Sequence, residues 1–464
     1  MLRKKYSEYK MKEIRSLTLL LVLSVCGLVA GETKPSESPY AEIVKNITGA
    51  KRPEKKAVSV TAFGAKGDGT SDCKPAFDKA MRKAKKQGGM HLRVPRGTYY
   101  IKGPIHLESN VWLELEEGSV LKFSPDPNHY PTVSTSWEGT FVMNHSPFIR
   151  GYEVENVTIS GKGLIDGNAM TTFSTWRAKQ EDDKQLSRQM NHRHTPVSER
   201  VFGKGHYLRP QLVQFYNCRG ITIEGVSITN SPFWCIHLLR SDNIICRSLK
   251  YNAKLVNNDG IDPESSSNIL IEDIDFDNGD DNVAIKSGRD DDGRQDGKAS
   301  ENIIIRKCRF KGLHGVVIGS EMSGGVRNVW VDSCTASGYC KRGIYIKTNP
   351  DRGGEIRNIN VTNTRFEDVE DLYLATSQYA GEGKDSQHFT VIEGLKVDGL
   401  SCRKAKRGGL ILDGTEAEPI RNAEFRNVTI EETPIGISFN RTEGVVLQDC
   451  NIGGRVESVP TMAK

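Results

Sequence analysis

Most of the chain repeats one pattern of hydrophobic and polar positions. From about residue 150 onward, an Asn or Gly is followed by residues that alternate between aliphatic and polar, as in residues 156–159 (Asn-Val-Thr-Ile). Alternation with a period of two is typical of β-strands and not of helices. From Gly220 to Asn358 the successive intervals are 23, 25, 34, 26 and 30 residues, each enough for one coil of three short strands. The residues that open the repeats are Asn156, Gly220, Asn243, Asn268, Asn302, Asn328, Asn358, Gly394, Asn422 and Gly444.

Strands that cannot bury their apolar side alone, repeated at this period, predict an all-β fold. The architecture we expect is a right-handed parallel β-helix, a solenoid with an aliphatic interior. Asn suits the turn that opens each coil, because it tolerates a left-handed backbone and can stack on itself. A β-sandwich is the competing interpretation, but it would lack a uniform repeat led by Asn. The pattern assigns residues 57–455 to the solenoid, between a linker (31–56) and a C-terminal tail (456–464).

The open N-terminal coil of a solenoid needs a cover, and the sequence offers a helix for it. Ser71 and Asp72 can cap a helix that begins near Lys74, and the Gly pair at 88–89 can end it. Further along, residues 171–206 are polar with little periodicity, which predicts a long excursion that builds a binding surface. The apolar stripe of the predicted capping helix consists of Ala76, Phe77, Ala80, Met81 and Ala84.

Composition narrows the class of protein. The 464 residues include 37% hydrophobic residues, 27% charged residues and 45 glycines, which is typical of a soluble globular protein and excludes collagen and a disordered chain. The formal net charge is +5, but residues 1–30 carry six basic and two acidic side chains, a net of +4, which leaves 5 − 4 = +1 for the rest. We therefore expect no nucleic-acid partner, and an acidic substrate would have to be attracted by a local cluster of charges.

Residues 1–30 have the pattern of a signal peptide. A basic stretch precedes an apolar run from Leu17 to Ala30, which is too short for a comfortable membrane span. We predict an exported protein, periplasmic or extracellular, with Met11 as an alternative start. Cys26 raises the alternative of a lipoprotein anchor, although Val25 before it is bulkier than the usual small residue.

The cysteines predict buried thiols and not a disulfide framework. Ten are present, and nine remain if Cys26 leaves with the signal, an odd number that cannot all pair. Cys308, Cys334 and Cys450 each follow the opening residue of a repeat by six positions, which indicates a stack in the interior. No cluster has zinc spacing, and we expect no metal site.

The candidate chemistry lies in aspartates spaced by about one coil. Asp259 is followed 21 positions later by the pair Asp280 and Asp281. Because neighbouring coils lie about 4.8 Å apart, three carboxyl groups should converge on one outer wall. An isolated Asp-Asp pair is usually a solvated turn, and only the one-coil spacing favours a site here. Gly279 permits the kink that both aspartates need to face one cleft. Crowded carboxyl groups should keep one proton near neutral pH, which is the division of labour of an acid and a base.

Two further coils extend this constellation. His314 and Lys347 each follow one coil later, once the charged insertion 287–298 is allowed for. The imidazole could orient a protonated acid, and the ammonium group could bind a substrate anion. Residues 289–294 (Arg-Asp-Asp-Asp-Gly-Arg) fail the spacing of an EF-hand, so we predict a salt-bridged loop that walls the cleft.

These blocks resemble those of a known family. The segments 257–259, 280–281, 314–315 and 346–347 are similar, in order and roughly in spacing, to the four signature blocks of the polygalacturonase family, glycoside hydrolase family 28. Flanking runs are similar to its bacterial exo-acting members in particular. The resemblance spans about residues 57–455.

The resemblance implies hydrolysis of α-linked galacturonic acid in pectin or pectic oligosaccharides, exo-acting, with inversion at the anomeric carbon, by a monomer without metal or cofactor. Carried over by position, it implies that Asp280 is the general acid and that Asp259 with Asp281 activates water. It also implies that Asn257 orients this network, that His314 supports the acid and that Lys347 binds a galacturonate carboxylate.

The sequence departs from the family at two positions. Leu313 precedes the histidine where the family usually has Gly, and Tyr345 stands where it usually has an Arg that grips the carboxylate with the lysine. Arg342, Arg289 or Arg294 could supply the missing charge, and we count Tyr345, Arg289 and Arg294 among the candidate substrate-binding residues. The exact sugar therefore stays open. The alternatives are a rhamnogalacturonan hydrolase, a calcium-dependent pectate lyase on the same fold, and a non-catalytic carbohydrate-binding β-helix.

Overall fold

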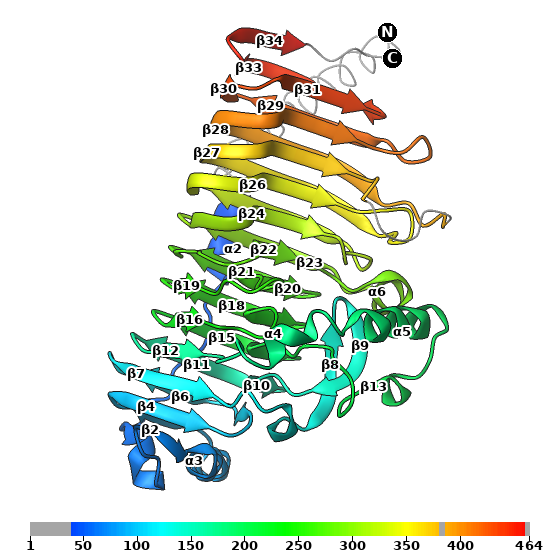
Figure 1. The fold of residues 1–464 in the computed structure, drawn as a ribbon. Coiled ribbons are helices and arrows are strands. Elements are labelled where there is room, and N and C mark those ends of the chain that lie inside the picture. The colour runs from blue at the N-terminus through cyan, green and yellow to red at the C-terminus, as the bar shows by residue number, and fades with distance from the viewer. Residues whose placement is uncertain (1–38, 380–385, 460–464) are drawn as a thin grey trace, which may run out of the picture. The chain divides into compact units, whose positions relative to one another are not determined.

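The computed structural model describes residues 39–379 and 386–459. From Ile43 onward the chain forms one compact unit of stacked strands, coloured from blue to red in Figure 1. The unit begins at Ile43, within helix α2 (Pro39–Asn46). The predicted signal peptide, with Met11 and Cys26, lies outside the described residues.

The first wall of the unit contains the strands that begin with the repeated Asn or Gly. Each pairs in parallel with its counterpart in the next coil, so that Ile269, Ile303 and Val329 are Cα partners. The wall consists of β1 (Val58–Ser59), β3 (Met90–Val94), β6 (Val111–Leu115), β11 (Glu155–Gly161), β15 (Arg219–Glu224), β18 (Asp242–Arg247), β21 (Ser267–Glu272), β23 (Ser300–Arg306), β25 (Val326–Asp332), parts of β27 (Glu355–Thr376) and β28 (Val391–Asp413), β29 (Ile420–Arg426) and β33 (Val446–Ile452).

The second wall carries the candidate chemistry, with Asp281, His314 and Arg342 as successive Cα partners. The long strands β24 (Arg309–Gly319), β26 (Thr335–Lys347), β27 and β28 each run through more than one wall and pair with the next coil in each of them. The second wall consists of β5 (Ile105–Leu107), β10 (Ile149–Tyr152), β14 (Val213–Tyr216), β17 (Ile236–Leu239), β20 (Ile261–Glu264), β22 (Asp281–Ile285), β24 (Arg309–Gly319), β26 (Thr335–Lys347), parts of β27 and β28, and β31 (Ile435–Asn440).

The third wall closes each coil. It begins with β2 (Asp68–Asp72), β4 (Gly97–Ile101), β7 (Ser119–Phe123), β12 (Leu164–Asp166), β16 (Ser227–Thr229) and β19 (Lys250–Asn252), and β30 (Thr429–Glu432) continues it at the far end. Short β32 (Thr442–Glu443) pairs with β29, and β34 (Arg455–Val459) pairs antiparallel with β33. The predicted right-handed parallel β-helix is confirmed.

The repeated Asn residues form a ladder along the first wall. Asn302 has a φ of 57°, in the left-handed region that Asn tolerates. Its side-chain amide donates to Asn268 at 3.1 Å and its carbonyl accepts from Asn328 at 3.1 Å. The stacking expected from the sequence thus satisfies this amide with the coil before and the coil after.

The interior is aliphatic and covered at its N-terminal end by α3 (Lys74–Lys86). The predicted stripe from Ala76 to Ala84 is the buried face of this helix. The cap differs in detail from the prediction, because the N-cap residue is Cys73, while Asp72 accepts a hydrogen bond from the backbone N–H of Lys74 at 2.9 Å. The nine cysteines among the described residues are buried and unpaired, as predicted.

Residues 171–206 form an arm beside the second wall (Figure 1). They contain α4 (Phe173–Trp176), α5 (Glu181–His192), η3 (Val197–Glu199) and β13 (Val201–Phe202). Strand β13 pairs with β9 (Thr140–His145), which pairs antiparallel with β8 (Thr132–Trp137). The remaining short elements are η1 (Val60–Phe63), η2 (Pro127–His129) and α6 (Asp290–Asp296).

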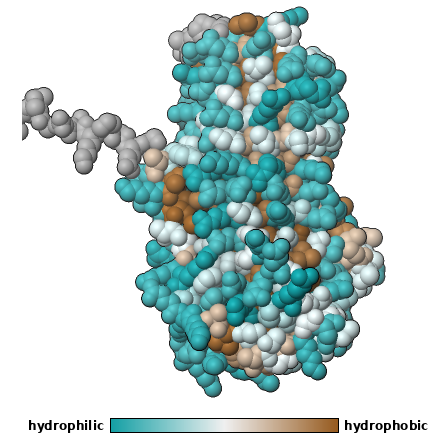
Figure 2. Space-filling view, turned by 90° about the vertical axis from the view of Figure 1, so that its left-hand side faces the viewer, coloured by the Kyte–Doolittle hydropathy of each residue, from teal (hydrophilic) through white to brown (hydrophobic). Residues whose placement is uncertain are grey.

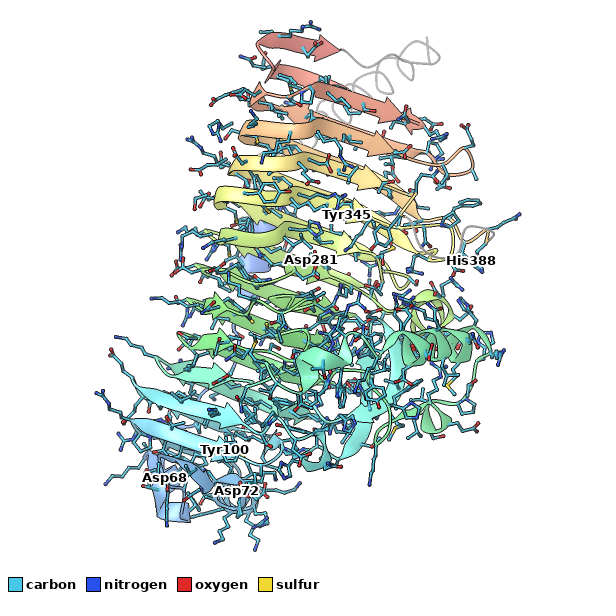
Figure 3. All side chains as sticks on the ribbon, in the orientation of Figure 1. Asp68, Asp72, Tyr100, Asp281, Tyr345 and His388 are labelled. Atoms are coloured by element: carbon cyan, nitrogen blue, oxygen red, sulfur yellow. The ribbon has the colours of Figure 1, made fainter. Side chains whose placement is uncertain are left out.

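The surface drawn in Figure 2 is largely hydrophilic, with hydrophobic residues in small separate groups. No helix in the described part of the chain is long and apolar enough to cross a membrane. Figure 3 places Asp281 and Tyr345 midway along the stack, well away from Asp68 and Asp72 at the N-terminal end.

Candidate active site

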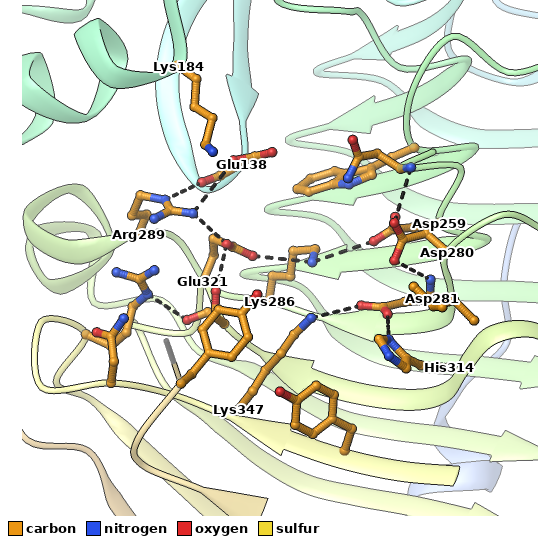
Figure 4. Close-up of a pocket in the computed structure, with 18 of the residues that line it drawn as sticks. Glu138, Lys184, Asp259, Asp280, Asp281, Lys286, Arg289, His314, Glu321 and Lys347 are labelled. Carbon is orange, nitrogen blue, oxygen red and sulfur yellow. Dashed lines mark hydrogen bonds and ion pairs between the residues drawn. The ribbon is translucent and has the colours of Figure 1, made fainter. Parts of the chain in front are cut away.

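A pocket of 570 Å³ lies between the second wall and the arm. Its floor comes from the coils that carry the predicted residues, and its side comes from α5 and the segment before it (Figure 4). The wall contributes Trp234, Asn257, Asp259, Asp280, Asp281, Lys286, His314, Arg342, Tyr345 and Lys347. The arm contributes Arg177, Gln180, Glu181, Lys184, Gln185 and Arg188.

The three aspartates stack as the one-coil spacing predicts. Asp259 precedes β20 and Asp281 begins β22, and the backbone N–H of Gly260 donates to the carbonyl of Asp281 at 2.9 Å. Glycine is needed at 279 because of a close approach, since a β carbon there would lie 2.2 Å from the carbonyl oxygen of Leu255. The kink expected at this glycine is therefore a matter of space and not of a left-handed φ.

Asp281 is held in its charged form. Its Oδ1 lies 2.5 Å from His314 Nδ1, and its Oδ2 lies 3.3 Å from Lys347 Nζ. Burial raises the pKa of Asp281, but the charge of Lys347 and the contact with His314 outweigh burial and hold the pKa below its usual range. Both oxygens of this carboxylate are thus engaged.

The pKa values of Asp280 and Asp259 are raised instead of lowered. Burial, and then the negative charge of Asp281, raise the pKa of Asp280. Its Oδ2 accepts a hydrogen bond from the backbone N–H of Asn257 at 3.2 Å, and Arg209 holds the Asn257 side chain at 2.6 Å. Burial also raises the pKa of Asp259 well above its usual range. The sequence predicts one protonated carboxyl group among the three aspartates, whereas the pKa values of two of them are raised.

A buried ion network beside the aspartates was not predicted. Lys286, one residue past β22, lies 3.8 Å from Asp259 Oδ2 and 3.4 Å from Glu321 Oε2. Arg289 lies 2.6 Å from Glu321 Oε1 and lines the pocket. The alternation of β22 is a signal for Lys286, since Ala284 two positions earlier faces outward with Val317 and Tyr345. Glu321 lies two residues past the end of β24, where the alternation has stopped, so the sequence offers no signal for it.

The ring of Tyr345 lies close to two cations. The Arg342 guanidinium lies 4.4 Å from the ring centroid, and Lys347 Nζ lies 5.3 Å from it. Arg342 also donates to Asp371 at 3.1 Å and lines the pocket. Of the three arginines considered as replacements for the missing charge, Arg342 and Arg289 line the pocket. Arg294 does not, because its guanidinium is bound to Asp291 at 2.6 Å.

The charged insertion forms helix α6 instead of the predicted loop, and its ion pairs hold the arm. Arg200 of the arm binds Asp292 at 2.5 and 3.0 Å, and Asn191 donates to the Arg289 carbonyl at 3.0 Å. Arg188 donates to Glu138 at 3.1 Å. The insertion is salt-bridged, as expected, and it fixes the arm that walls the pocket.

Asp280, Asp281 and His314 are close enough together to share a metal ion, since their ligand atoms lie within 4.8 Å of one another. Lys347 occupies the free side of Asp281, so an ion placed there would meet an ammonium group 3.3 Å from one of its ligands. The donor set suits proton transfer better than cation binding.

Comparisons with known proteins agree with this site. A family model for "Glycosyl hydrolases family 28" matches residues 122–450. A probable polygalacturonase of Vitis vinifera is 28% identical over 390 residues, which cover 81% of this chain and 74% of that protein. An exo-poly-alpha-D-galacturonosidase of Dickeya chrysanthemi is 25% identical over 353 residues, 70% of this chain and 58% of that protein.

A solved structure is similar along nearly its whole length. The hyperthermoactive exopolygalacturonase of Thermotoga maritima aligns with a TM-score of 0.82 and 38% sequence identity, covering 88% of this chain and 95% of that one. The segment matched by the family model, residues 122–450, includes the coils that carry the aspartates. The chain therefore belongs to family 28 of the glycosyl hydrolases, and the protein is a glycoside hydrolase.

Proposed function

We propose that the protein removes α-linked galacturonate from the ends of pectic chains by hydrolysis with inversion. The names of its relatives in Thermotoga maritima and Dickeya chrysanthemi support an exo action on galacturonan. One observation carries the proposal: a group of stacked aspartates lies in a pocket that has cations on two sides.

The cations match an acidic sugar chain. Lys184 and Arg188 line the pocket from the arm, and Arg342 and Lys347 line it from the second wall. Outside residues 1–30 the chain has a formal charge of only +1, so this concentration of positive charge is local. A galacturonan carries one carboxylate per sugar, and it would meet a cation on either side of the aspartates.

The pKa values of the three aspartates suit a single displacement. Asp280, whose pKa is raised, gives its proton to the leaving oxygen while the glycosidic C–O bond breaks. A water molecule forms the new bond to the anomeric carbon from the opposite side and loses its proton to a carboxylate. Asn257 holds Asp280 through its backbone N–H, and His314 and Lys347 keep Asp281 charged.

The arm favours action at chain ends. Helix α5 supplies one side of the pocket and is fixed by Arg188, Asn191 and, beyond the helix, Arg200. A fixed wall beside the aspartates leaves room for few sugars on that side, because a long polymer would have to pass through the arm. Tyr345, close to Arg342 and Lys347, offers a ring and a hydroxyl to the sugar on the other side.

Product chromatography tests the proposal. Incubation with oligogalacturonides of increasing length should release the same small product from the first time point, whatever the length of the substrate. A spread of product sizes would indicate cutting within the chain, and release from rhamnogalacturonan alone would indicate the alternative hydrolase. Inertness toward both substrates would overturn the proposal. The Asp280→Asn variant is the control for contaminating activity.

The role of the arm can be tested separately. Lys184→Ala should raise KM for oligogalacturonides roughly tenfold, because one charge-assisted contact is lost, and leave kcat nearly unchanged. Lys250, exposed on the third wall, provides the matched control Lys250→Ala, for which no change is expected. Equal effects of both variants would show that Lys184 acts only through net charge.

A further inference from the structure

A buried carboxyl group that nothing above explains lies beside Asp259. It belongs to Asp262, the second residue of β20, whose exposed fraction is 0%. In residues 39–379 and 386–459, no N–H or hydroxyl group donates to either oxygen of Asp262, or to Oδ1 of Asp259. An isolated buried carboxylate with no donor is strongly disfavoured, so each of these two carboxyl groups has to be stabilised by the other.

The surroundings leave the two carboxyl groups short of positive charge. Lys286 Nζ lies 3.8 Å from Asp259 Oδ2 and 3.8 Å from Asp262 Oδ1, and it is also 3.4 Å from Glu321 Oε2. Its ammonium group lies 4.7 Å from the centroid of the Trp234 ring, which shields it from water. One ammonium group therefore faces three carboxyl groups, an arrangement that favours keeping a proton on one of them.

The other groups near Asp262 do not relieve this shortage. Glu264 of the same strand and Asp281 of β22 add negative charge, and the neighbours Cys235 and Tyr251 are neutral because burial raises their pKa values well above the usual range. The imidazole of His237, the Cα partner of Asp262, is engaged at both nitrogens. Its Nε2 lies 2.7 Å from Glu264 and its Nδ1 lies 2.9 Å from Gln214.

Asp259 and Asp281 consequently differ as proton acceptors. Both oxygens of Asp281 are engaged, one by His314 at 2.5 Å and the other by Lys347 at 3.3 Å. Oδ1 of Asp259 has no donor among the described residues, and Asp259 lines the pocket. A carboxylate that two positive partners stabilise is a weak base, whereas one with a free oxygen in a dry site is a stronger base.

We propose that Asp262 is a positioning residue that shares one proton with Asp259 and thereby makes Asp259 the base of the reaction. Before the reaction the proton is bound to Asp262, whose O–H donates a hydrogen bond to the negatively charged Asp259. The attacking water then gives a proton to Oδ1 of Asp259 as its oxygen bonds to the anomeric carbon, and the leaving oxygen takes the proton of Asp280. The pair ends with two protons, and one returns to Asp280 through solvent. In support, the side chain of Asp259 lies within hydrogen-bonding reach of Asp262, and burial raises the pKa values of both groups.

This inference rests on the proposed function, so hydrolysis of oligogalacturonide by the wild type is measured first. If no hydrolysis is seen, the proposed function fails. Given hydrolysis, the test is the pH dependence of kcat/KM for Asp262→Asn, whose amide can donate to Asp259 but cannot share a proton. The acidic limb should move to higher pH by about one unit, because the carboxylic acid of Asp262 stabilises the Asp259 carboxylate more than an amide N–H does, and the maximal kcat should fall at least about tenfold. A lower rate with an unmoved acidic limb would overturn the inference.

The matched control is Glu264→Gln. Glu264 is an equally buried carboxyl group two residues further along the same strand, bound to His237 and Ser136 and not to Asp259. Its substitution should leave the acidic limb in place. An equal shift in both variants would show that loss of any buried charge here moves the profile, and would contradict a shared proton.

A spectroscopic test does not depend on the folding of an Asp262 variant. The Asp280→Asn protein lacks the carboxyl group of the general acid. Infrared spectroscopy of this variant in D2O at neutral pH should still show the band of a protonated buried carboxyl group. Absence of that band would overturn the inference. Where Asp262→Asn folds, as judged by its thermal unfolding, the band should vanish in the Asp280→Asn, Asp262→Asn double variant.

Discussion

The first and second walls stack polar side chains by the same geometry, with opposite consequences. In the middle of the first wall the amides of Asn302 and Asn328 each donate to the Asn of one neighbouring coil and accept from the Asn of the other. Along the second wall Asp259 and Asp281 can only accept when ionised, so the column needs cations or protons to complete it. A neutral ladder stabilises a solenoid, and an acidic column in the same scaffold creates groups with divergent pKa values.

The largest effect should come from removing the proton of the acid. Asp280→Asn is nearly isosteric but cannot protonate the leaving oxygen, so kcat on oligogalacturonides should fall about 10³-fold. KM should change little, and the thermal unfolding temperature should stay at or above that of the wild type, because a buried carboxyl group among like groups is replaced by an amide that cannot ionise. Steady-state kinetics with the wild type in parallel check this, and retention of more than a tenth of kcat would contradict the role of Asp280.

The next largest effect should come from uncoupling a carboxylate from its cation. Lys347→Met leaves Asp281 buried without its ammonium partner, which should reduce the free energy of unfolding at pH 7 by roughly 3 kcal/mol. The folded pKa of Asp281 is lower than its unfolded value, so its stabilisation is present above about pH 4 and disappears as pH falls through the folded pKa. The difference between variant and wild type, measured by denaturant unfolding, should therefore shrink in acid.

A difference that is independent of pH would contradict the pairing of Lys347 with Asp281. Because the ammonium group also lowers the pKa of Asp281, the acidic limb of kcat should move to higher pH in this variant. Asp262→Asn leaves the pairing of Lys347 with Asp281 in place, so the pH dependence of the free energy of unfolding distinguishes the two carboxylates.

A smaller effect is expected from a break in the neutral ladder. Asn302→Ala removes two side-chain hydrogen bonds and places a β carbon at a φ of 57°, which should cost about 2 kcal/mol. Asn302→Gly restores the backbone freedom without the amide, and should cost about half as much. Denaturant unfolding measures both, and kcat should be unchanged. A large loss of kcat would show that the two walls are not separable.

The smallest effect belongs to the aliphatic interior. Ile303→Val removes one methylene from a buried position that lies between Ile269 and Val329 in register, and should reduce the free energy of unfolding by about 1 kcal/mol without changing kcat or its pH profile. Its measurement calibrates the other four variants against a purely structural change. A change in the pH profile would contradict the separation of interior from site.

The fold could be predicted because its signal is periodic. The intervals between Asn or Gly residues fix the coil length, and the coil length alone brings Asp259 beside Asp280 and Asp281. His314 and Lys347 followed by the same arithmetic, and the structure places both on Asp281. One-coil spacing is thus enough to find residues that stand on the strands.

Residues held by irregular segments could not be found this way. Helix α5 buries Asp183, Ser187, Arg188 and Asn191, so its inner face is polar and leaves no apolar period to detect. Its position depends on ion pairs and hydrogen bonds to groups far away in sequence, such as Glu138. The roles of Lys286 and Glu321 likewise become apparent only from their ion pair in the folded structure.

The stereochemistry of the first product tests the central claim most directly, because direct attack by water inverts the anomeric carbon, whereas a covalent intermediate leads to retention. Proton NMR of the anomeric region, recorded within the first minutes of hydrolysis of an α-linked trigalacturonate, should show the β-anomer at the newly formed reducing end before mutarotation. Initial appearance of the α-anomer would require a covalent intermediate, and would contradict the acid and base roles assigned to these aspartates.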